Sequence, residues 1–171
     1  MVTHESRRVS RVFLLLFTAL LVGCDHATKL AVMMKIGAGD EVKIVPGVLD
    51  LRYAKNDDMA FSLLRQLDHG APLFHKSLFL ITISLVVLAV VLTAWWKRRR
   101  DPSRALHVGF ALVVAGAAGN VIDRILRGYV VDFIHVHMWP IFNVADVLIV
   151  AGAILLALVA QSRSSSRDAR V

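Results

Sequence analysis

The stretch Ser77 to Trp96, SLFLITISLVVLAVVLTAWW, decides the fold of this chain. It contains no charged residue, and a helix of this length spans about 30 Å, the thickness of the hydrocarbon core of a bilayer. We therefore predict that it crosses a membrane. The whole chain agrees, because 57% hydrophobic residues, a mean hydropathy of +0.63 and a formal charge of +7 are typical of an integral membrane protein with basic loops. A soluble nucleic-acid-binding protein would be far less apolar.

Three further segments are long and apolar enough to cross a membrane, although polar residues interrupt them. They are Val12 to Met34, Ala105 to Leu126 and Ile141 to Ala160. With Ser77 to Trp96 they predict a mainly α-helical membrane protein, four transmembrane helices in a single domain over residues 1–171. Residues 161–171 are rich in Ser and Arg and are expected to be disordered.

Lys and Arg are unevenly distributed among the connections, and this predicts the orientation, because cytoplasmic loops carry an excess of both. The connection 35–76 is balanced in charge and 127–140 holds one basic residue, so both are expected outside and both termini in the cytoplasm. The cytoplasmic basic residues should set this topology and contact anionic lipid. They are Arg7, Arg8, Arg11, Lys97, Arg98, Arg99, Arg100, Arg104, Arg163, Arg167 and Arg170.

The first outer segment, residues 35–76, has a pattern of its own. Val42 to Ile44 and Leu49 to Tyr53 alternate apolar with polar residues on either side of Pro46-Gly47. This predicts two short strands joined by a turn. A short interfacial helix is expected near Ser62 to Leu67. The outer surface should therefore carry a small β element.

The N-terminal segment allows a second interpretation. Basic residues before an apolar run that ends in Leu21-Val22-Gly23-Cys24 are also typical of a bacterial lipoprotein signal peptide, which would make Cys24 a lipidated first residue. The helical pattern continues to Met34 and the chain returns to the membrane three more times. We therefore favour a small buried cysteine, which as the only one in the chain cannot form an internal disulfide.

Two charged residues interrupt the first predicted helix. Asp25 and Lys29 stand four positions apart on the face that also holds Thr28, so they can form an ion pair one helical turn long. Charges inside a membrane are costly unless they are paired. We interpret the pair as structural, with a direct part in catalysis as the alternative.

The third predicted helix carries a similar polar group. Asn120, Asp123 and Arg124 follow the small-residue run of residues 115–119, whose Gly and Ala let helix backbones approach closely. We expect Arg124 to pair with Asp123. Such a pair could either clamp two helices together or hold a substrate.

Two aspartates stand where hydrophobic segments meet their outer boundary. Asp132 follows the third predicted helix, and Asp146 lies near the start of the fourth, on one face with Asn143. Topology puts both at one depth, and the connection between them is long enough to bring them together. Because ionised carboxylates are costly where water is scarce, the pair favours a shared proton, the state that activates water. We predict a catalytic pair, although either aspartate alone could be a helix cap or structural acceptor.

Other chemistries find less support in the sequence. His135 and His137 could join Asp132 around a metal ion, but no HExxH motif or cysteine set accompanies them, so we expect neither a metal nor a cofactor. A small ion-coupled transporter would need acids near the midplane and repeated helices. Serine nucleophiles lack a lysine partner or a nucleophile elbow at Ser62, Ser77 and Ser84.

Five short motifs occur in order along the chain. They read Asp25-x-x-Thr28-Lys29, Asn56-x-x-x-Ala60-Phe61-Ser62, Gly119-Asn120-x-x-Asp123-Arg124, Gly128-x-Val130-Val131-Asp132-Phe133 and Phe142-Asn143-x-Ala145-Asp146. Together, and in this order, they resemble the motifs of the lipoprotein signal peptidase family, also called signal peptidase II. The last three are specific as a set, although none is specific alone.

This resemblance implies an integral-membrane aspartic endopeptidase of the bacterial inner membrane, with a small periplasmic β-cradle and a short periplasmic helix. It would remove the signal peptide of prolipoproteins that carry a diacylglyceryl-cysteine, cutting before that cysteine. Its partners would be prolipoproteins and membrane lipids, with no nucleic acid, and we expect a monomer. By motif match the catalytic dyad would be Asp132 and Asp146. The pocket would be lined by Asn56, Asn120, Arg124 and Asn143. The scaffold around it would be supported by Asp25, Lys29 and Asp123.

Two positions depart from the family pattern. His26 stands where the family usually has Gln, and Asp58 replaces the glycine of the family's Asn-x-Gly-x-Ala-Phe motif. Glycine adopts positive φ at little cost, whereas aspartate tolerates it less readily. The carboxylates of Asp57 and Asp58 could also change substrate preference or raise the pKa of the dyad. These departures concern the loop after Asn56 and leave room for a relative that binds lipopeptides without cutting them.

The mechanism predicted for the pair is general acid–base hydrolysis without a covalent intermediate. One ionised carboxylate would take a proton from a water molecule as that water attacks the scissile carbonyl, while the protonated partner hydrogen-bonds the carbonyl oxygen. Which aspartate begins ionised stays open, because the shared proton belongs to the pair.

Overall fold

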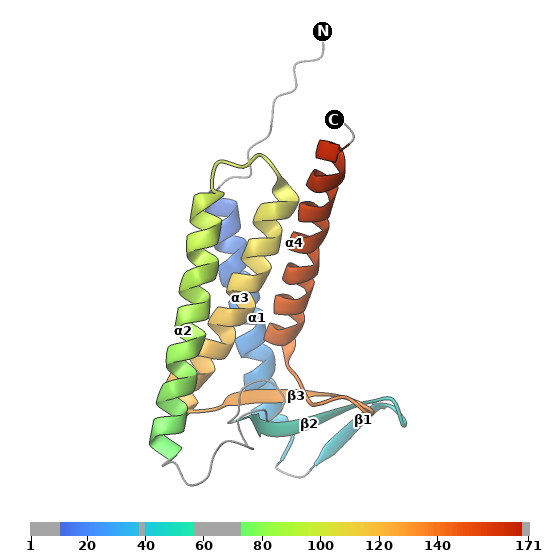
Figure 1. The fold of residues 1–171 in the computed structure, drawn as a ribbon. Helices are drawn as coiled ribbons and strands as arrows, with labels where there is room; N and C mark the ends of the chain where they lie inside the picture. The colour runs from blue at the N-terminus through green and yellow to red at the C-terminus, as the bar shows by residue number, and fades with distance from the viewer. Residues whose placement is uncertain (1–10, 38–39, 57–72, 169–171) are drawn as a thin grey trace.

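The computed structural model describes residues 11–37, 40–56 and 73–168, which form four helices and a three-stranded sheet (Figure 1). All four helices are long and apolar enough to cross a membrane, which confirms the predicted fold class. The helix expected near Ser62 to Leu67 lies outside the described residues. The four helices are α1 (Arg11–Lys35), α2 (Leu73–Lys97), α3 (Arg104–Arg127) and α4 (Val144–Asp168).

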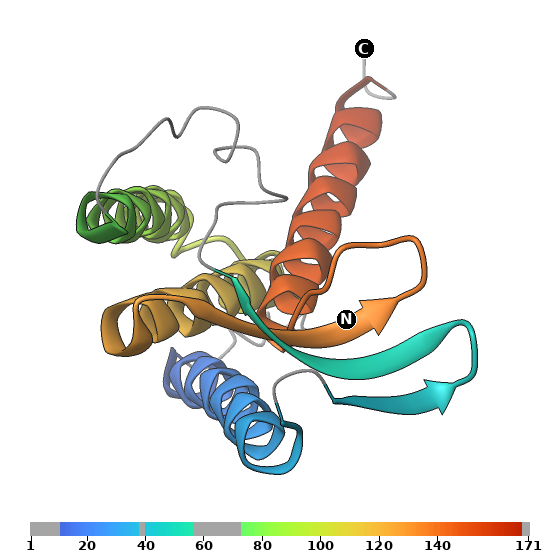
Figure 2. The same ribbon diagram turned by 90° about the horizontal axis from the view of Figure 1, so that it is seen from below.

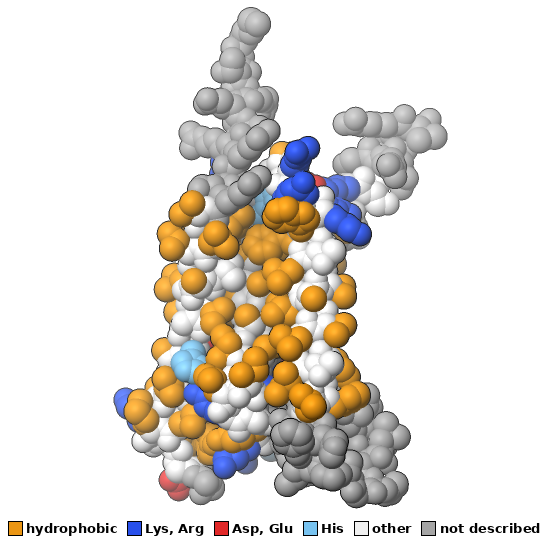
Figure 3. All heavy atoms as spheres, turned by 90° about the vertical axis from the view of Figure 1, so that its left-hand side faces the viewer, with side chains coloured by type: hydrophobic (Ala, Val, Ile, Leu, Met, Phe, Trp, Pro, Cys, Tyr) orange, Lys and Arg blue, Asp and Glu red, His pale blue; other side chains and the backbone are white. Residues whose placement is uncertain are grey.

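Helix α3 forms the centre of the bundle. In its most apolar stretch 61% of the residues are buried, against 6% to 17% in the other three helices, because α1, α2 and α4 each pack against α3 (Figure 2). The outward surfaces carry exposed Leu, Val, Ile and Phe side chains, and Figure 3 shows them as a belt along the helices. Such a surface is stable in contact with lipid and not with water.

Glycines set the close packing of α3 against α4. A Cβ atom on Gly116 would overlap the carbonyl oxygen of Ala145, and one on Gly152 would lie 2.7 Å from the carbonyl oxygen of Gly109. The two backbones therefore touch at these points. This confirms the prediction that the small-residue run in α3 permits a close helix contact.

The ends of α4 differ from the prediction. The helix begins at Val144 instead of Ile141, because Phe142 forms a β-bridge with Ile134 and Asn143 caps the helix. The predicted disorder of the tail is wrong for residues 161–168, which continue α4. These residues include no Gly or Pro to end a helix, and Arg163 is held to Asp101 by two hydrogen bonds.

The single cysteine also differs from the prediction. Cys24 is exposed instead of buried. Its neighbour Asp25 is 1% exposed, so the charged face of α1 turns into the bundle and carries Cys24 outward. Consecutive helix residues point about 100° apart, so both cannot face the interior.

The sheet covers one end of the bundle. Its strands are β1 (Glu41–Val45), β2 (Leu49–Asn56) and β3 (Val130–Val136), antiparallel in the order β1-β2-β3. The first two confirm the predicted strand pair, and Gly47 in the turn between them has a φ of 73°. The third strand was not predicted. It anchors the sheet on the bundle, because Phe133 packs with Val32 of α1 and with Ile36, which directly follows this helix.

Candidate active site

Strand pairing brings Asn56 to Asp132. In the register of β2 and β3, Ala54 lies opposite Asp132 and Asn56 lies opposite Val130, so Asn56 and Asp132 are diagonal neighbours on one face of the sheet. The side-chain nitrogen Nδ2 of Asn56 donates a hydrogen bond of 2.8 Å to Oδ2 of Asp132. The two residues are 76 positions apart in the chain. Only the sheet makes them neighbours.

A backbone reversal after β3 brings Asn143 to the same carboxylate. The chain turns at Met138, which has a φ of 67°, and returns so that Phe142 exchanges hydrogen bonds of 3.0 and 2.8 Å with Ile134. Asn143 thereby reaches Asp132 and donates from Nδ2 to Oδ1 over 2.6 Å. Both carboxylate oxygens of Asp132 thus accept a hydrogen bond from an amide.

The first turn of α4 positions Asp146. Its backbone N–H donates to Oδ1 of Asn143 over 3.0 Å, and the backbone N–H of Asn143 donates to Oδ2 of Asp146 over 3.2 Å. This reciprocal pair is a capping box, with Asn143 as the N-cap and Asp146 three residues later. Asn143 therefore touches both aspartates of the predicted pair. Asp146 also serves the helix start, as the sequence left open.

Asn120 of α3 joins the same network. Its Nδ2 donates to Oδ1 of Asp146 over 2.9 Å, and its Oδ1 accepts from Nδ2 of Asn143 over 3.2 Å and from Nζ of Lys29 over 3.1 Å. The amide orientation follows from these partners, since Lys29 can only donate. Asn120 thus connects the aspartate pair to the charged residues deeper in the bundle.

Lys29 is the centre of a buried ion cluster. Its ammonium nitrogen lies 2.7 Å from Oδ2 of Asp25 and 2.9 Å from Oδ2 of Asp123, and all three side chains are at most 1% exposed. The predicted Asp25–Lys29 ion pair is therefore present. The other oxygen of Asp25 accepts the backbone N–H of Ala145 over 2.9 Å, which ties α1 to the first turn of α4. This cluster supports the residues that hold the aspartate pair.

Asp123 pairs differently from the prediction. Its partners are Lys29 and Arg127, and it also accepts the backbone N–H of Val131 over 3.3 Å. The expected pair with Arg124 is not formed, because consecutive helix residues point apart whereas Arg127 lies one turn later. The i, i+4 spacing of Asp123 and Arg127 was a signal in the sequence that our prediction missed.

Arg124 instead lies near the aspartate pair. It interacts electrostatically with Asp146 and Asp132, and its Nη1 is 3.5 Å from the carbonyl oxygen of Asn120. Its Nε atom is buried and has no hydrogen-bond partner. A buried donor without a partner costs free energy until a ligand accepts from it. Arg124 is therefore suited to bind an oxygen of a substrate.

The pKa of Asp132 is raised to about 6, mainly by burial and to a smaller extent by the nearby charge of Asp146. The hydrogen bonds from Asn56 and Asn143 and the charge of Lys29 act in the opposite direction, because they favour the ionised form. Asp132 is 2% exposed, so water does little to stabilise its charge. Near pH 6 Asp132 is therefore present in both its protonated and its ionised form.

The residues weighed as metal ligands do not come together. His135 lies 3.6 Å from Oδ2 of Asp50, and it is an odd number of positions from Asp132 on the same strand, so the two point to opposite faces. Within residues 11–37, 40–56 and 73–168, no group of three His, Cys, Asp or Glu side chains could hold a metal ion.

Residues 17–161 match the family model described as signal peptidase (SPase) II. The chain belongs to this family. Two relatives named lipoprotein signal peptidase illustrate the match. The protein of Pelotomaculum thermopropionicum is 39% identical over 162 residues, which cover 93% of this chain and 99% of the relative. That of Geobacter metallireducens is 36% identical over 157 residues, covering 88% and 93%.

Solved structures agree with this membership of the signal peptidase II family. A structure described as "Bacterial membrane enzyme structure by the in meso method at 2.3 A resolution" is 27% identical and has a TM-score of 0.81, with 95% of this chain and 96% of that chain covered. A second bacterial membrane enzyme is 25% identical, with a TM-score of 0.76 and coverage of 92% and 97%. The chain is thus a multi-pass bacterial membrane protein of a protease family.

Proposed function

We propose that this protein is an aspartic endopeptidase that cleaves the signal peptide of prolipoproteins before their diacylglyceryl-cysteine. The observation that carries the proposal is the position of Asn143, which is hydrogen bonded to both Asp132 and Asp146. A pair of neighbouring aspartates in which one, Asp132, is buried and has a raised pKa is the arrangement that acid–base activation of water requires. Membership of the signal peptidase II family supplies the substrate class.

In the proposed reaction a water molecule lies between the two carboxyl groups. The ionised carboxylate takes a proton from this water as its oxygen attacks the scissile carbonyl carbon, and the protonated carboxyl donates a hydrogen bond to the carbonyl oxygen. The tetrahedral intermediate then breaks at the C–N bond, and the leaving amine takes up a proton. No acyl-enzyme forms. The proton is shared by the two carboxyl groups, so it is not assigned to one aspartate at the start of the reaction.

The surrounding amides hold the pair in place for this step. Asn56 and Asn143 each engage one oxygen of Asp132, and Asn120 with the backbone of Asn143 engages both oxygens of Asp146. Each carboxyl oxygen keeps a second lone pair for water or substrate. Arg124 supplies donors for a substrate carbonyl. The ion cluster of Asp25, Lys29 and Asp123 holds the amide of Asn120 in place through Lys29.

The proposed orientation has both termini in the cytoplasm and the sheet at the periplasmic face of the inner membrane. The connection Lys97 to Arg104 at the end opposite the sheet is strongly basic, which supports this orientation. The substrate would keep its acyl chains in the outer part of the bilayer while its backbone reaches the aspartate pair. The working unit is a monomer, whose partners are the prolipoprotein and the surrounding lipids.

Processing of a diacylglyceryl-modified model prolipoprotein, followed by gel shift, tests the proposal. Wild type should convert the substrate, and the variants Asp132→Asn and Asp146→Asn should not. Asp40→Asn is the matched control, because this aspartate is exposed at the same end of the molecule and should leave the rate unchanged. Processing by both dyad variants at the wild-type rate would exclude an aspartic mechanism.

Mass spectrometry of the product tests the cleavage position. The mature fragment should begin with the lipidated cysteine, and a substrate without the diacylglyceryl group should be cut far more slowly. A product that begins elsewhere would contradict the proposed position. If wild type binds the lipopeptide and never cuts it, the protein is a binding relative instead of a protease.

A further inference from the structure

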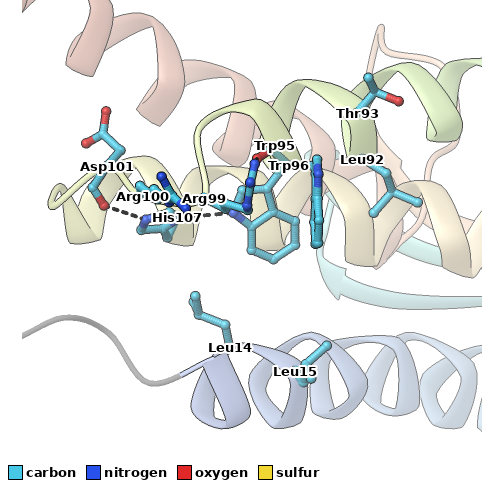
Figure 4. Close-up of a pocket in the computed structure, with 10 residues that line it drawn as sticks. All are labelled: Leu14, Leu15, Leu92, Thr93, Trp95, Trp96, Arg99, Arg100, Asp101 and His107. Carbon is cyan, nitrogen blue, oxygen red and sulfur yellow. Dashed lines mark hydrogen bonds between the residues drawn. The ribbon is translucent and has the colours of Figure 1, made fainter.

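A cavity lies at the end of the bundle away from the sheet. Its volume is about 1200 Å³, and it opens between the start of α1 and the end of α2, two helices that both pack against α3. Figure 4 shows Leu14 and Leu15 of α1 facing the indole rings of Trp95 and Trp96 across this gap. None of the residues assigned to the aspartate site lines it.

One wall of the cavity is held rigidly. The indole Nε1 of Trp95 donates to Nδ1 of His107 over 3.0 Å, so this histidine nitrogen carries no proton. The other ring nitrogen of His107, Nε2, donates its proton to the backbone carbonyl oxygen of Asp101 over 2.8 Å. The ring of Trp95 is also stacked on Phe110, with centroids 6.1 Å apart. The Trp95 ring is therefore a fixed apolar surface.

The rim of the cavity carries uncompensated positive charge. Arg99 lies over the ring of Trp96, 4.6 Å from its centre, and Arg100 stands beside it. Among the described residues of the lining the acidic one is Asp101, and both of its carboxylate oxygens are bonded to Arg163, over 2.7 and 2.8 Å. In the described part of the chain, neither Arg99 nor Arg100 forms an ion pair with an acid. Figure 3 shows Lys and Arg side chains gathered at this end.

We propose that this cavity binds an anionic glycerophospholipid of the cytoplasmic leaflet. Its phosphodiester would contact Arg99 and Arg100, and its acyl chains would run along Leu14, Leu15 and Leu92 between α1 and α2. Apolar walls below a cationic rim match the two parts of such a lipid, and free phosphate would leave those walls empty. The site rests on the orientation proposed above but not on the proposed chemistry.

The depth of the cavity agrees with this occupant. The charge-free stretch of α2 ends at Trp96, and tryptophan is enriched where hydrocarbon meets headgroups. The cavity therefore lies across that boundary. A signal peptide is a poor alternative occupant, because its N-terminal region is positively charged and would be repelled by the arginines.

Quenching of tryptophan fluorescence by lipids with brominated acyl chains tests the site directly. The chain has three tryptophans, and Trp139→Phe leaves Trp95 and Trp96 as the only reporters, both in the cavity wall. Purified protein in nanodiscs is titrated with brominated phosphatidylglycerol and, separately, with brominated phosphatidylcholine. Half-quenching should need at least about fivefold less of the anionic lipid, since two arginines each favour a negative headgroup.

Two double variants separate a site from a diffuse surface charge. R99Q with R100Q should abolish the preference for phosphatidylglycerol, whereas K97Q with R98Q removes the same charge from residues outside the lining and should keep it. Equal quenching by both lipids in the parent, or equal loss in both double variants, would overturn the proposal. If R99Q/R100Q does not fold, displacement of the brominated lipid from the parent protein tests the proposal instead. Unbrominated phosphatidylglycerol should displace the brominated lipid, and phosphatidylcholine should not. Equal displacement by both lipids would overturn the proposal. Quenching needs no cleavage, so its outcome is independent of the protease assignment.

Discussion

Two pairs of aspartates in this protein have opposite surroundings. Asp25 and Asp123 lie against cations, with Lys29 between them and Arg127 on the outer side of Asp123. Asp132 and Asp146 receive their hydrogen bonds from amides instead, and in the described residues neither forms an ion pair. A cation keeps a buried carboxylate ionised, whereas amides orient it without neutralising its charge. The first pair is therefore structural, and the second is able to hold and release a proton.

Removing either amide-bound carboxylate should have the largest effect. Asp132→Asn and Asp146→Asn should each lower the processing rate by about 10³-fold or more, because each removes one partner of the acid–base pair. Stability should not fall in parallel. Because the pKa of Asp132 is raised from 3.8 to about 6 in the folded protein, stability falls as the pH rises between these two values, and the loss is complete at pH 7.5. Asp132→Asn should therefore unfold at the same or a higher temperature at this pH. Rate assays with thermal unfolding of the same samples check both parts. A large loss of stability would show that Asp132 acts as a structural residue.

Removing the cation of the other pair should act mainly on stability. Lys29→Met leaves Asp25 and Asp123 buried near each other without their shared partner, which should destabilise the protein by about 3–5 kcal/mol. Thermal unfolding in detergent measures this loss. Lys43→Met is the control, because Lys43 is 62% exposed and its ion pair is screened by water. An unchanged unfolding temperature in Lys29→Met would show that the ion cluster does not stabilise the fold.

Added volume beside Asp25 should have a smaller effect. A Cβ atom at Gly119 would lie 2.6 Å from Oδ2 of Asp25, so Gly119→Ala must shift the ion cluster and should cost about 1–3 kcal/mol. Gly23→Ala is the matched control, since nothing lies within 4 Å of its Cβ position and alanine favours a helix. It should be neutral or stabilising. Equal unfolding temperatures of the two variants would contradict the tight contact at Gly119.

The smallest expected effect concerns the pH dependence of the amide-bound pair. With Asp132 at a pKa of about 6, kcat/KM should fall as the pH rises through this value and the site loses its shared proton. The hydrogen bond from Asn56 favours the ionised form, so Asn56→Ala should raise the pKa and move the falling limb up by about half to one pH unit. The position of the limb is the readout, whatever happens to the maximal rate. If the falling limb moves to lower pH in Asn56→Ala, the hydrogen bond from Asn56 does not lower the pKa of Asp132, and this prediction is wrong.

Features that depend on local sequence could be predicted. Four apolar runs gave the helices, the spacing of Asp25 and Lys29 gave their ion pair, and alternation around Pro46-Gly47 gave β1 and β2. In each of them the residues in contact are near one another in the chain, so periodicity and turn chemistry carry the signal.

Features that depend on residues far apart in the chain could not be predicted from the sequence. The first four residues of β3 are all buried, so the strand lacks the alternation that marks a half-exposed one, and its pairing with β2 joins segments 76 residues apart. The start of α4 depends on the bridge between Phe142 and Ile134 in the same way. The sequence placed Asp132 and Asp146 at one depth, but the contact of both with Asn143 required this reversal of the chain.

Infrared titration of the carboxyl groups tests most directly whether the amide-bound pair holds a proton. Wild type at pH 5 should show a buried carboxylic acid band that disappears with a midpoint near pH 6, and this band should be absent in Asp132→Asn and retained in Asp123→Asn. A band that persists in Asp132→Asn and is lost in Asp123→Asn would contradict the account, because the proton would then reside in the cation-bound cluster.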